Sequence, residues 1–425
     1  MLEALLAVAV FIVLLLLGIP VAFAILAGAV VGLFAVGSLP MEGLAQQSFS
    51  PLGDYSILAI PFFILTADLL FSGKLGAQVI GLATRVVGRL RGGVGMTSVL
   101  TNAVFAGISG SAVADATGIG KVVIPWTKRL GYSGGYATAV NASASSLGVI
   151  LPPSIPMILF ASASGASVAA VFTAGIGPGI LTAILLLIGC WLVAWKAGFP
   201  RVKAKFTLKR LLVDLLFATP AILIPIILIR VVLFTGIATV TEVSVLAVLY
   251  ALGVRVLLYR DLNLAQLRKA LIDSASASAV VLLLIMFSSA LAWLLTIQEA
   301  PQALAETLTS TLQAEWLVTL AMIVILLVVG MFLDISPAIL LLTPVMLPVA
   351  NAIGMDLIHF GIIMVVNLAI GFVTPPIGVN LFVASSLTDI PLMDIARKAM
   401  PMIVYFLIAL IVITFVPALS LALLG

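Results

Sequence analysis

The sequence predicts an all-α polytopic membrane protein with two inverted repeats, each made of a re-entrant hairpin and a discontinuous helix. The first observation is composition: 63% of the 425 residues are hydrophobic and 8% are charged, whereas soluble proteins carry about 25% charged residues. The second is the recurrence along the chain of apolar stretches of about 20 residues, which is enough to span a bilayer. The third is a pattern of glycine and proline that occurs twice.

The same composition excludes several classes of function. The net charge is +4 and the 20 basic residues form no concentrated face, so nucleic-acid binding is not expected. One cysteine, Cys190, and one histidine, His359, cannot supply a disulfide or a Cys- or His-rich metal site within the chain. Gly120-Lys121 is followed by a valine instead of the Ser or Thr of a phosphate-binding loop, so ATP is not an evident energy source.

Clusters of basic residues predict which loops face the cytoplasm. These clusters lie within 85–91, 128–129, 196–210, 255–269 and 397–398. The stretches between them carry mainly acids, such as Glu42 and Asp54 in one stretch and Glu306 in another. One tracing of the chain satisfies nearly all of these charges, and it places both termini outside the cytoplasm.

In that tracing the chain begins with two spans near 1–17 and 21–37, which turn at Gly18-Ile19-Pro20. A third span near 57–72 returns to the cytoplasm, where 75–91 is expected to form an amphipathic surface helix. Later spans are predicted near 168–195, 211–233, 237–258, 279–297 and 401–423.

Two regions, 92–165 and 314–387, contain no clean span, because Gly, Ser, Thr, Pro or Asp interrupts their apolar arms. Broken backbone at mid-membrane depth survives only where it is buried in protein or lines a cavity. We therefore expect the functional site in these two regions.

The two interrupted regions align when the chain is shifted by 223 residues without gaps. The shift superposes Gly107 on Gly330, Pro125 on Pro348, Gly131 on Gly354, Gly148 on Gly371, and Pro152-Pro153 on Pro375-Pro376. Gly and Pro determine backbone shape more than lipid-facing surface, so the match predicts two copies of one structure.

Each copy is predicted to be a hairpin followed by a broken helix. The first has arms near 95–106 and 116–127, a tip at 107–115 and a break at 148–154. The second has arms near 316–329 and 337–349, a tip at 330–336 and a break at 371–376. The charge-derived tracing opens the hairpins to opposite sides of the membrane, which makes the repeats inverted, as in many secondary transporters.

The hairpin tips carry the candidate chemistry. Ser109 and Ser111 provide hydroxyls, and Asp115 and Asp334 are the acids of the tips. An ionisable residue at mid-membrane is by default a functional candidate. The alternative is structural: Asp115 caps the second arm of its hairpin, and Asp334 pairs with a backbone N–H.

The proline pairs of the two breaks remove backbone donors and free upstream carbonyls. Free carbonyls with nearby hydroxyls suit a small cation such as Na⁺, whereas a half-helix N-terminus suits an anion. A kink needed only for packing is the alternative. Asn141, Asn367 and Asn380 are further candidates to reach a substrate, because an unpaired amide is costly to bury.

The segments 107–115 and 371–380, together with Pro152-Pro153-Ser154, resemble the large membrane subunit of tripartite ATP-independent periplasmic (TRAP) transporters. Ile60-Pro61-Phe62-Phe63, which opens the third span, resembles it as well. The resemblance covers essentially the whole chain, and these motifs in this order are highly specific. It implies the fold of the ion-transporter superfamily, in which a transport domain moves against a scaffold in an elevator mechanism.

The resemblance also implies a division of the chain into scaffold and transport domain. The scaffold would comprise 1–91 with an amphipathic arm, 168–278 with cytoplasmic loops, 279–313 with a connecting arm, and 388–425 with an amphipathic segment and the last helix. The transport domain would comprise 92–167 and 314–387.

In functional terms the resemblance implies a symporter, not an enzyme, that imports an organic acid such as a C4-dicarboxylate or a sialic acid with Na⁺. It implies two partners in the bacterial inner membrane and periplasm: a small four-helix membrane subunit and a soluble substrate-binding protein. The chain offers no soluble domain to capture a solute and no further four-helix segment, so both partners are expected to be separate chains.

Carried over residue by residue, the resemblance implies two Na⁺ sites and a substrate site between the tips. The Na⁺ ligands are expected among Ser109, Ser111, Asp115, Gly148, Leu151 and Pro153 in the first repeat, and Gly330, Asp334, Gly371 and Thr374 in the second. The substrate contacts are expected from Ser109, Gly110, Ser111, Ser154, Thr374, Pro375 and Asn380.

Three alternatives are weighed against this hypothesis. The main one is a stand-alone divalent-anion permease of the same superfamily, which needs neither partner. An ion channel is disfavoured because two inverted hairpins that meet at closed sites leave no open conduction path. A membrane-embedded enzyme is less favoured still, although the sequence leaves a Ser/Lys or Asp/Asp pair open.

Overall fold

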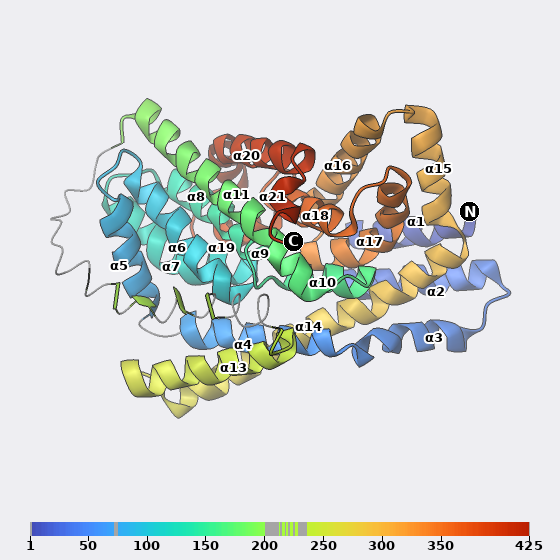
Figure 1. The fold of residues 1–425 in the computed structure, drawn as a ribbon, viewed down its shortest axis with the longest axis horizontal. Helices are drawn as coiled ribbons and strands as arrows, with labels where there is room; N and C mark the ends of the chain where they lie inside the picture. The colour runs from blue at the N-terminus through green and yellow to red at the C-terminus, as the bar shows by residue number, and fades with distance from the viewer. Residues whose placement is uncertain are drawn as a thin grey trace.

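The computed structural model describes residues 2–71, 75–199 and 236–424, with isolated positions between 212 and 227. All regular elements of these residues are helical (Figure 1). Among them, six helices are long and apolar enough to cross a membrane, or up to eight if each bent pair is one span. Most of the predicted span 211–233 and most of the predicted loop 196–210 lie outside the described residues.

One group of helices forms a layer along one side of the molecule, and all but its first member lie in the lower part of Figure 1. It contains α1 (Leu2–Leu16), α2 (Val21–Val36), α3 (Met41–Phe49), α4 (Ala59–Phe71), α13 (Val240–Gly253) and the long α14 (Leu264–Ile297). The short 3₁₀ turns Ser50–Gly53 and Tyr55–Leu58 lead into α4, and the π-helical turn Val254–Tyr259 follows α13. Helix α14 packs against α2, α3 and α4, and α13 packs against α4.

The first repeat follows α4. Its helices are α5 (Leu75–Val87), α6 (Gly93–Ser109), α7 (Ala112–Arg129), α8 (Gly134–Ser145), α9 (Leu147–Ile150), α10 (Ile155–Ser164) and α11 (Val168–Ala197). Helices α6 and α7 form the first hairpin, and α8 to α10 form the first broken helix.

The second repeat follows α14. Its helices are α15 (Ala300–Leu312), α16 (Glu315–Phe332), α17 (Ile335–Ala352), α18 (Leu357–Gly371), α19 (Val379–Ser386) and α20 (Leu392–Phe415), and the chain ends with α21 (Ala418–Leu421). Helices α16 and α17 form the second hairpin, and α18 and α19 form the second broken helix.

The helices of the two repeats are related by the same shift of 223 residues that aligns their sequences. Adding 223 to the bounds of α7 gives the bounds of α17, and the N-cap of α7, Ser111, falls on the N-cap of α17, Asp334. Each break contains a cis bond between its two prolines. Helices α5 and α11 match α15 and α20 at the same shift, so the repeat extends beyond the predicted hairpin and broken helix.

The repeats also pack reciprocally. Helix α10 contacts α17, and its counterpart α19 contacts α7. Likewise α20 contacts α8, and its counterpart α11 contacts α18. Equivalent helices of the two repeats therefore form equivalent contacts with the other repeat. The predicted fold class, an all-α membrane protein built from repeats with a hairpin and a broken helix, is confirmed.

Several predicted boundaries shift. The hairpin tips are shorter than predicted, because α6 continues to Ser109 and α7 starts at Ala112, and only Leu333 and Asp334 separate α16 from α17. Helix α14 starts at Leu264, 15 residues before the predicted span at 279, because Asn263 and Gln266 form a capping box there. The last span starts after Pro391 and ends at Phe415, earlier than the predicted 401–423.

Candidate functional site

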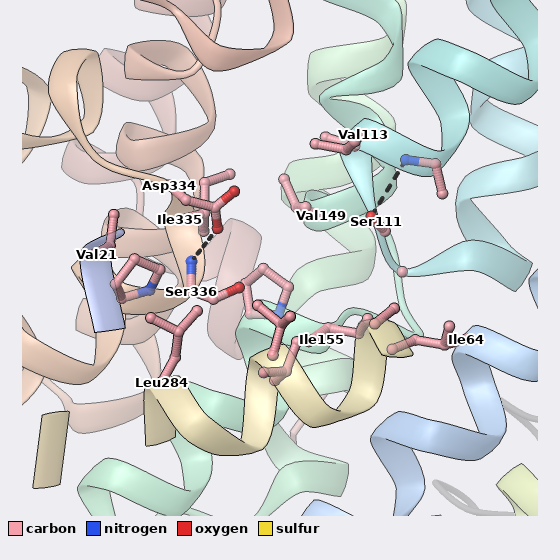
Figure 2. Close-up of a pocket in the computed structure, with 18 of the residues that line it drawn as sticks. Val21, Ile64, Ser111, Val113, Val149, Ile155, Leu284, Asp334, Ile335 and Ser336 are labelled. Atoms are coloured by element: carbon pink, nitrogen blue, oxygen red, sulfur yellow. Dashed lines mark hydrogen bonds between the residues drawn. The ribbon is translucent and has the colours of Figure 1, made fainter. Parts of the chain in front are cut away.

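A cavity of about 750 Å³ lies where the two hairpin tips meet the layer of helices α2, α4 and α14 (Figure 2). One wall is the first tip, from Ser109 to Ala114, and the facing wall is the second tip, from Asp334 to Pro337. The start of α2, one side of α4 and the middle of α14 close the remaining sides. The two tips are more than 220 residues apart in sequence, so the repeat architecture creates this site.

The first tip is a two-residue turn. Gly110 ends α6 with a left-handed φ of 60°, a conformation that glycine adopts without a steric penalty. The Ser111 N–H donates to Ser109 Oγ (3.3 Å), and the Ala114 N–H donates to Ser111 Oγ (3.4 Å). Ser111 therefore caps α7, and both serine oxygens are placed at the turn.

The first tip is tied to the break of the first broken helix. The Ile155 N–H donates to the Gly110 carbonyl (3.2 Å), just after the proline pair. Ser154 caps α10, and its hydroxyl donates to the Val149 carbonyl (2.6 Å). Pro152, Pro153 and Ser154 are all buried, so hairpin and break form one closed unit.

Asp115 lies in the first turn of α7, directly behind the tip. Its side chain is 0% exposed, and among the described residues no basic side chain pairs with the carboxylate, whose nearest polar neighbour is a hydroxyl. The Ser109 hydroxyl is adjacent to it, and a Cβ on Gly148 would collide with Asp115 Oδ2. The structure thus places Asp115, Ser109 and Gly148 next to one another, and Ser111, not Asp115, caps the helix.

The second tip holds its carboxylate differently. Asp334 caps α17, and the Ser336 N–H donates to Asp334 Oδ1 (2.9 Å; Figure 2). Asp334 is half-buried and lines the cavity. The hydrogen bond from the Ser336 N–H is the structural role that the sequence suggested as the alternative for Asp334. In addition, the Asp334 side chain lines the cavity.

The second break repeats the tie to its hairpin. The Gly378 N–H donates to the Met331 carbonyl (3.3 Å), and Gly378 is the counterpart of Ile155. Gly371 lies directly against the backbone of Gly330. The Thr374 hydroxyl donates to the Ile370 carbonyl (2.6 Å). Unlike the first break, the second is open on one side, where Pro376 and Ile377 are exposed.

The cavity receives only part of the predicted substrate site. Ser109, Gly110 and Ser111 line it. Ser154, Thr374, Pro375 and Asn380 are not among its lining residues. Among the predicted Na⁺ ligands, Gly148, Leu151 and Pro153 lie around the first break, and only Asp334 of the second group reaches the cavity wall.

The asparagines connect helices. Asn380 Nδ2 donates to the Ala142 carbonyl (2.9 Å) and to Ser145 Oγ (2.8 Å), which ties α19 to α8 across the repeats. Asn141 Nδ2 donates to the Ala116 carbonyl, and Asn367 Nδ2 to the Ile323 carbonyl, both at 2.9 Å. In each case the amide nitrogen is used within the protein, while the side-chain oxygen has no partner among the described residues.

Two cavity residues were missed from the sequence: Asp68 of α4 and Asp273 of α14. The Ser274 hydroxyl donates to Asp68 Oδ2 (2.7 Å), so the two helices meet at this carboxylate. Asp68 was recognisable as an acid inside the apolar stretch 57–72. Asp273 was not, because the predicted span began at 279.

The electrostatics of the cavity are one-sided. Its acidic lining residues are Asp68, Asp273 and Asp334, and no Lys, Arg or His of the described residues lines it. With Asp115 behind the first tip, the carboxylate oxygens of this region are acceptors, and the donors among the described lining residues are hydroxyls and backbone N–H groups. An arrangement of this kind attracts cations.

Comparisons with known proteins agree with this architecture. Residues 8–419 match the family model of the tripartite ATP-independent periplasmic transporter, DctM component. The chain is 34% identical to the C4-dicarboxylate TRAP transporter large permease protein DctM of Pseudomonas aeruginosa, over 90% of this chain and 89% of that protein. It is 32% identical to the sialic acid TRAP transporter large permease protein SiaM of Vibrio cholerae, over 96% of this chain and 95% of that protein.

A solved structure shares the fold at low sequence identity. The YdaH transporter of Alcanivorax borkumensis superposes with a TM-score of 0.64, at 15% identity, over 92% of this chain and 90% of that one. The family match spans nearly the whole chain, and the motifs of the two tips and breaks occupy equivalent places in both repeats. The chain therefore belongs to the DctM family, the large membrane component of tripartite ATP-independent periplasmic transporters.

Proposed function

We propose that this chain is the membrane subunit that moves an organic acid across the bacterial inner membrane together with Na⁺. The observation that carries the proposal is the Asp115 carboxylate, which is fully buried and has no cationic partner among the described residues. A buried carboxylate without a counter-charge is strongly unfavourable. A cation bound between Asp115, the Ser109 hydroxyl and the carbonyls of the first break would supply that charge.

The charge of the cavity explains why transport would require a cation. Two like charges about 4 Å apart repel by roughly 4 kcal/mol at an effective dielectric constant of about 20. An organic anion that enters a cavity lined by Asp68, Asp273 and Asp334 meets this repulsion at several points. Bound Na⁺ at the two tips would cancel it, so substrate binds well only after the ions.

Hard cations such as Na⁺ bind oxygen ligands, and the first tip and break offer several kinds in one place. Carboxylate oxygens come from Asp115, hydroxyls from Ser109 and Ser111, and carbonyls from the segment 148–153. The second site would form between the Asp334 tip and the break at Gly371 and Thr374. This pairing of a hairpin tip with a broken helix supports one Na⁺ site in each repeat.

The mechanism we propose is of the elevator type. Each hairpin is hydrogen-bonded to the break of its own repeat, through Ile155 and Gly110 in one and Gly378 and Met331 in the other. Helices α2, α4 and α14 form the opposite wall of the cavity. The hairpins and broken helices (92–167 and 314–387) would move as one transport domain against a scaffold formed by the other helices.

The partners follow from family membership. We propose a small four-helix membrane subunit and a periplasmic substrate-binding protein that delivers the substrate, with both termini of this chain in the periplasm. The named relatives transport a C4-dicarboxylate and a sialic acid, which are carboxylates of different size, so we propose a carboxylate as the substrate.

The test is uptake into proteoliposomes that contain this chain and its small subunit. The substrate is chosen by a thermal-shift screen on the binding protein, and the Na⁺ gradient and the binding protein are varied separately. An equimolar choline gradient is the control for the Na⁺ gradient. Uptake that requires both the Na⁺ gradient and the binding protein supports the proposal. Uptake without Na⁺ would refute the coupling, and uptake without the binding protein would favour a stand-alone anion permease.

A further inference from the structure

The cavity at the tips has one side that differs in polarity from the tips themselves. This side consists of the lining residues of α4 and α14, and we name it the α4–α14 wall. Its lining residues are apolar apart from Asp68 and Asp273. Figure 2 shows Ile64 of α4 and Leu284 of α14 on this wall, with Ser111 on the other side. No side chain of the wall donates a hydrogen bond, because an ionised carboxylate only accepts.

The Asp68 carboxylate is held in place but keeps the capacity to accept another hydrogen bond. The Ser274 hydroxyl donates to Asp68 Oδ2 (2.7 Å), and among the described residues no group donates to Asp68 Oδ1. Asp273 is close enough to Asp68 for their charges to repel. Neither acid forms an ion pair with a described residue. A ligand that brings a donor or a positive charge to this wall would relieve that repulsion.

The hydrogen-bond donors of the cavity lie on its other sides. The hydroxyls of Ser109, Ser111 and Ser336 belong to the two tips, and the first N–H groups of α2 are the free donors of a helix start. The inference rests on the proposed function, in which Na⁺ binds at the tips. A substrate carboxylate is therefore expected at the tips, and the remote end of the substrate faces the α4–α14 wall.

The α4–α14 wall then discriminates between chemical groups at that remote end. A second carboxylate would be repelled by Asp68 and Asp273 and would find no side-chain donor, and a polar group buried without a partner is unfavourable. A hydroxyl or an ammonium group could instead donate to Asp68 Oδ1. We propose that Asp68 is a specificity-determining residue, which selects organic acids with a hydroxyl or ammonium donor remote from their carboxylate over plain dicarboxylates.

The test compares a substrate with its analogue in which hydrogen replaces the remote donor group. The substrate is the one that the screen on the binding protein identifies, and both compounds are taken up by proteoliposomes with the small subunit. The ratio of the two uptake rates is measured for the wild type and for Asp68→Leu. The same binding protein is used throughout, so its own selectivity cancels between variants. Asp394→Leu is the control, since Asp394 is 58% exposed and lies outside the cavity.

We expect the ratio to fall by about tenfold or more in Asp68→Leu, because a hydrogen bond to a charged group contributes at least this factor. The ratio should stay at the wild-type value in Asp394→Leu. If Asp68→Leu does not fold, Ser274→Ala replaces it. This variant keeps the Asp68 carboxylate but removes the hydroxyl that holds it, so the ratio should fall in the same direction.

Two results would overturn the inference. One is a substrate without a remote donor, such as a plain dicarboxylate, and the other is a ratio that the substitution at Asp68 or Ser274 leaves unchanged. Failure of the proposed function is read separately, from the Na⁺ dependence of uptake. Uptake without a Na⁺ gradient would refute the coupling, whereas the ratio of the two rates would still report on Asp68.

Discussion

The two hairpin tips have the same backbone but different electrostatics. Ser111 and Asp334 occupy equivalent positions and both cap the second arm of their hairpin. In the first repeat the carboxylate is one turn further along, at Asp115, where it is buried and has no cationic partner among the described residues. In the second repeat the carboxylate is the cap itself, bonded to the Ser336 N–H and open to the cavity.

The breaks behind the tips differ in burial, and again the first repeat is the more enclosed. Pro152, Pro153 and Ser154 are buried, whereas Pro376 and Ile377 are exposed. A duplicated backbone has thus been adapted into a closed site with an unpaired charge and an open site with a paired one. The difference leads us to expect that the first repeat binds its cation more tightly than the second.

The largest effect is expected for Asp115→Asn. This substitution removes the buried charge that a cation would neutralise, and loss of one partner of a buried charge pair costs about 3–5 kcal/mol. We expect Na⁺-driven uptake to fall by about 100-fold or more, a factor that corresponds to ~3 kcal/mol. The measurement is initial uptake in proteoliposomes as a function of Na⁺ concentration. Uptake by this variant at the wild-type rate would contradict a role of Asp115 in Na⁺ binding.

A smaller loss is expected for Gly148→Ala, which leaves all charges in place. The added methyl group would collide with the Asp115 carboxylate, and overpacking of this kind costs roughly 1–3 kcal/mol. We expect the Na⁺ concentration for half-maximal uptake to rise about tenfold, at the low end of that range. The control is Gly81→Ala in α5, where a Cβ meets no atom within 4 Å; an equal effect of both variants would contradict the prediction.

A moderate effect is expected for Asp334→Ser, which copies the cap of the first hairpin into the second. Serine retains the helix cap, since both residues are good N-caps, so thermal stability should remain close to that of the wild type. Loss of the charge should raise the half-maximal Na⁺ concentration by only a few-fold, because the Asp334 carboxylate is already hydrogen-bonded to the Ser336 N–H and depends less on a cation. If this variant is as defective as Asp115→Asn, the two tips are not different in the proposed way.

The smallest effect on transport is expected for Asn380→Ala. Its amide nitrogen bonds to α8, and loss of a buried hydrogen-bonding partner costs about 1–3 kcal/mol of stability. We expect a lower melting temperature in detergent but an unchanged half-maximal substrate concentration. A large rise in that concentration without a change in melting temperature would instead make Asn380 a substrate contact, as the family resemblance implies.

Glycine and proline explain why so much of the fold was predictable. Pro152-Pro153 and Pro375-Pro376 cannot continue a helix, so the breaks were visible in the sequence, and their constant spacing revealed the repeat. The acids of the two tips, Asp115 and Asp334, were visible because a charge in an apolar stretch is conspicuous. Both signals are local, and local signals survive in a single sequence.

The rest depends on contacts between distant segments. Asp68 and Asp273 become cavity residues only because α4 and α14 pack beside each other, with Ser274 bonded to Asp68. Asn380 finds its partner 238 residues away, at Ala142. No periodicity in the sequence indicates such pairs, so the predicted substrate site and the lining of the cavity agree only at Ser109, Gly110 and Ser111.

The most direct test of the central claim is the number of Na⁺ ions bound by the purified protein. Binding of radioactive Na⁺ is measured at equilibrium for the wild type, Asp115→Asn and Asp334→Ser. The melting temperature of each protein in choline buffer checks that the variants are folded in the absence of Na⁺. We predict that Asp115→Asn binds one ion fewer per chain than the wild type. Asp334→Ser should bind the same number of ions as the wild type, with a weaker affinity at the second tip. An unchanged number of ions in Asp115→Asn would contradict the claim that a cation neutralises Asp115.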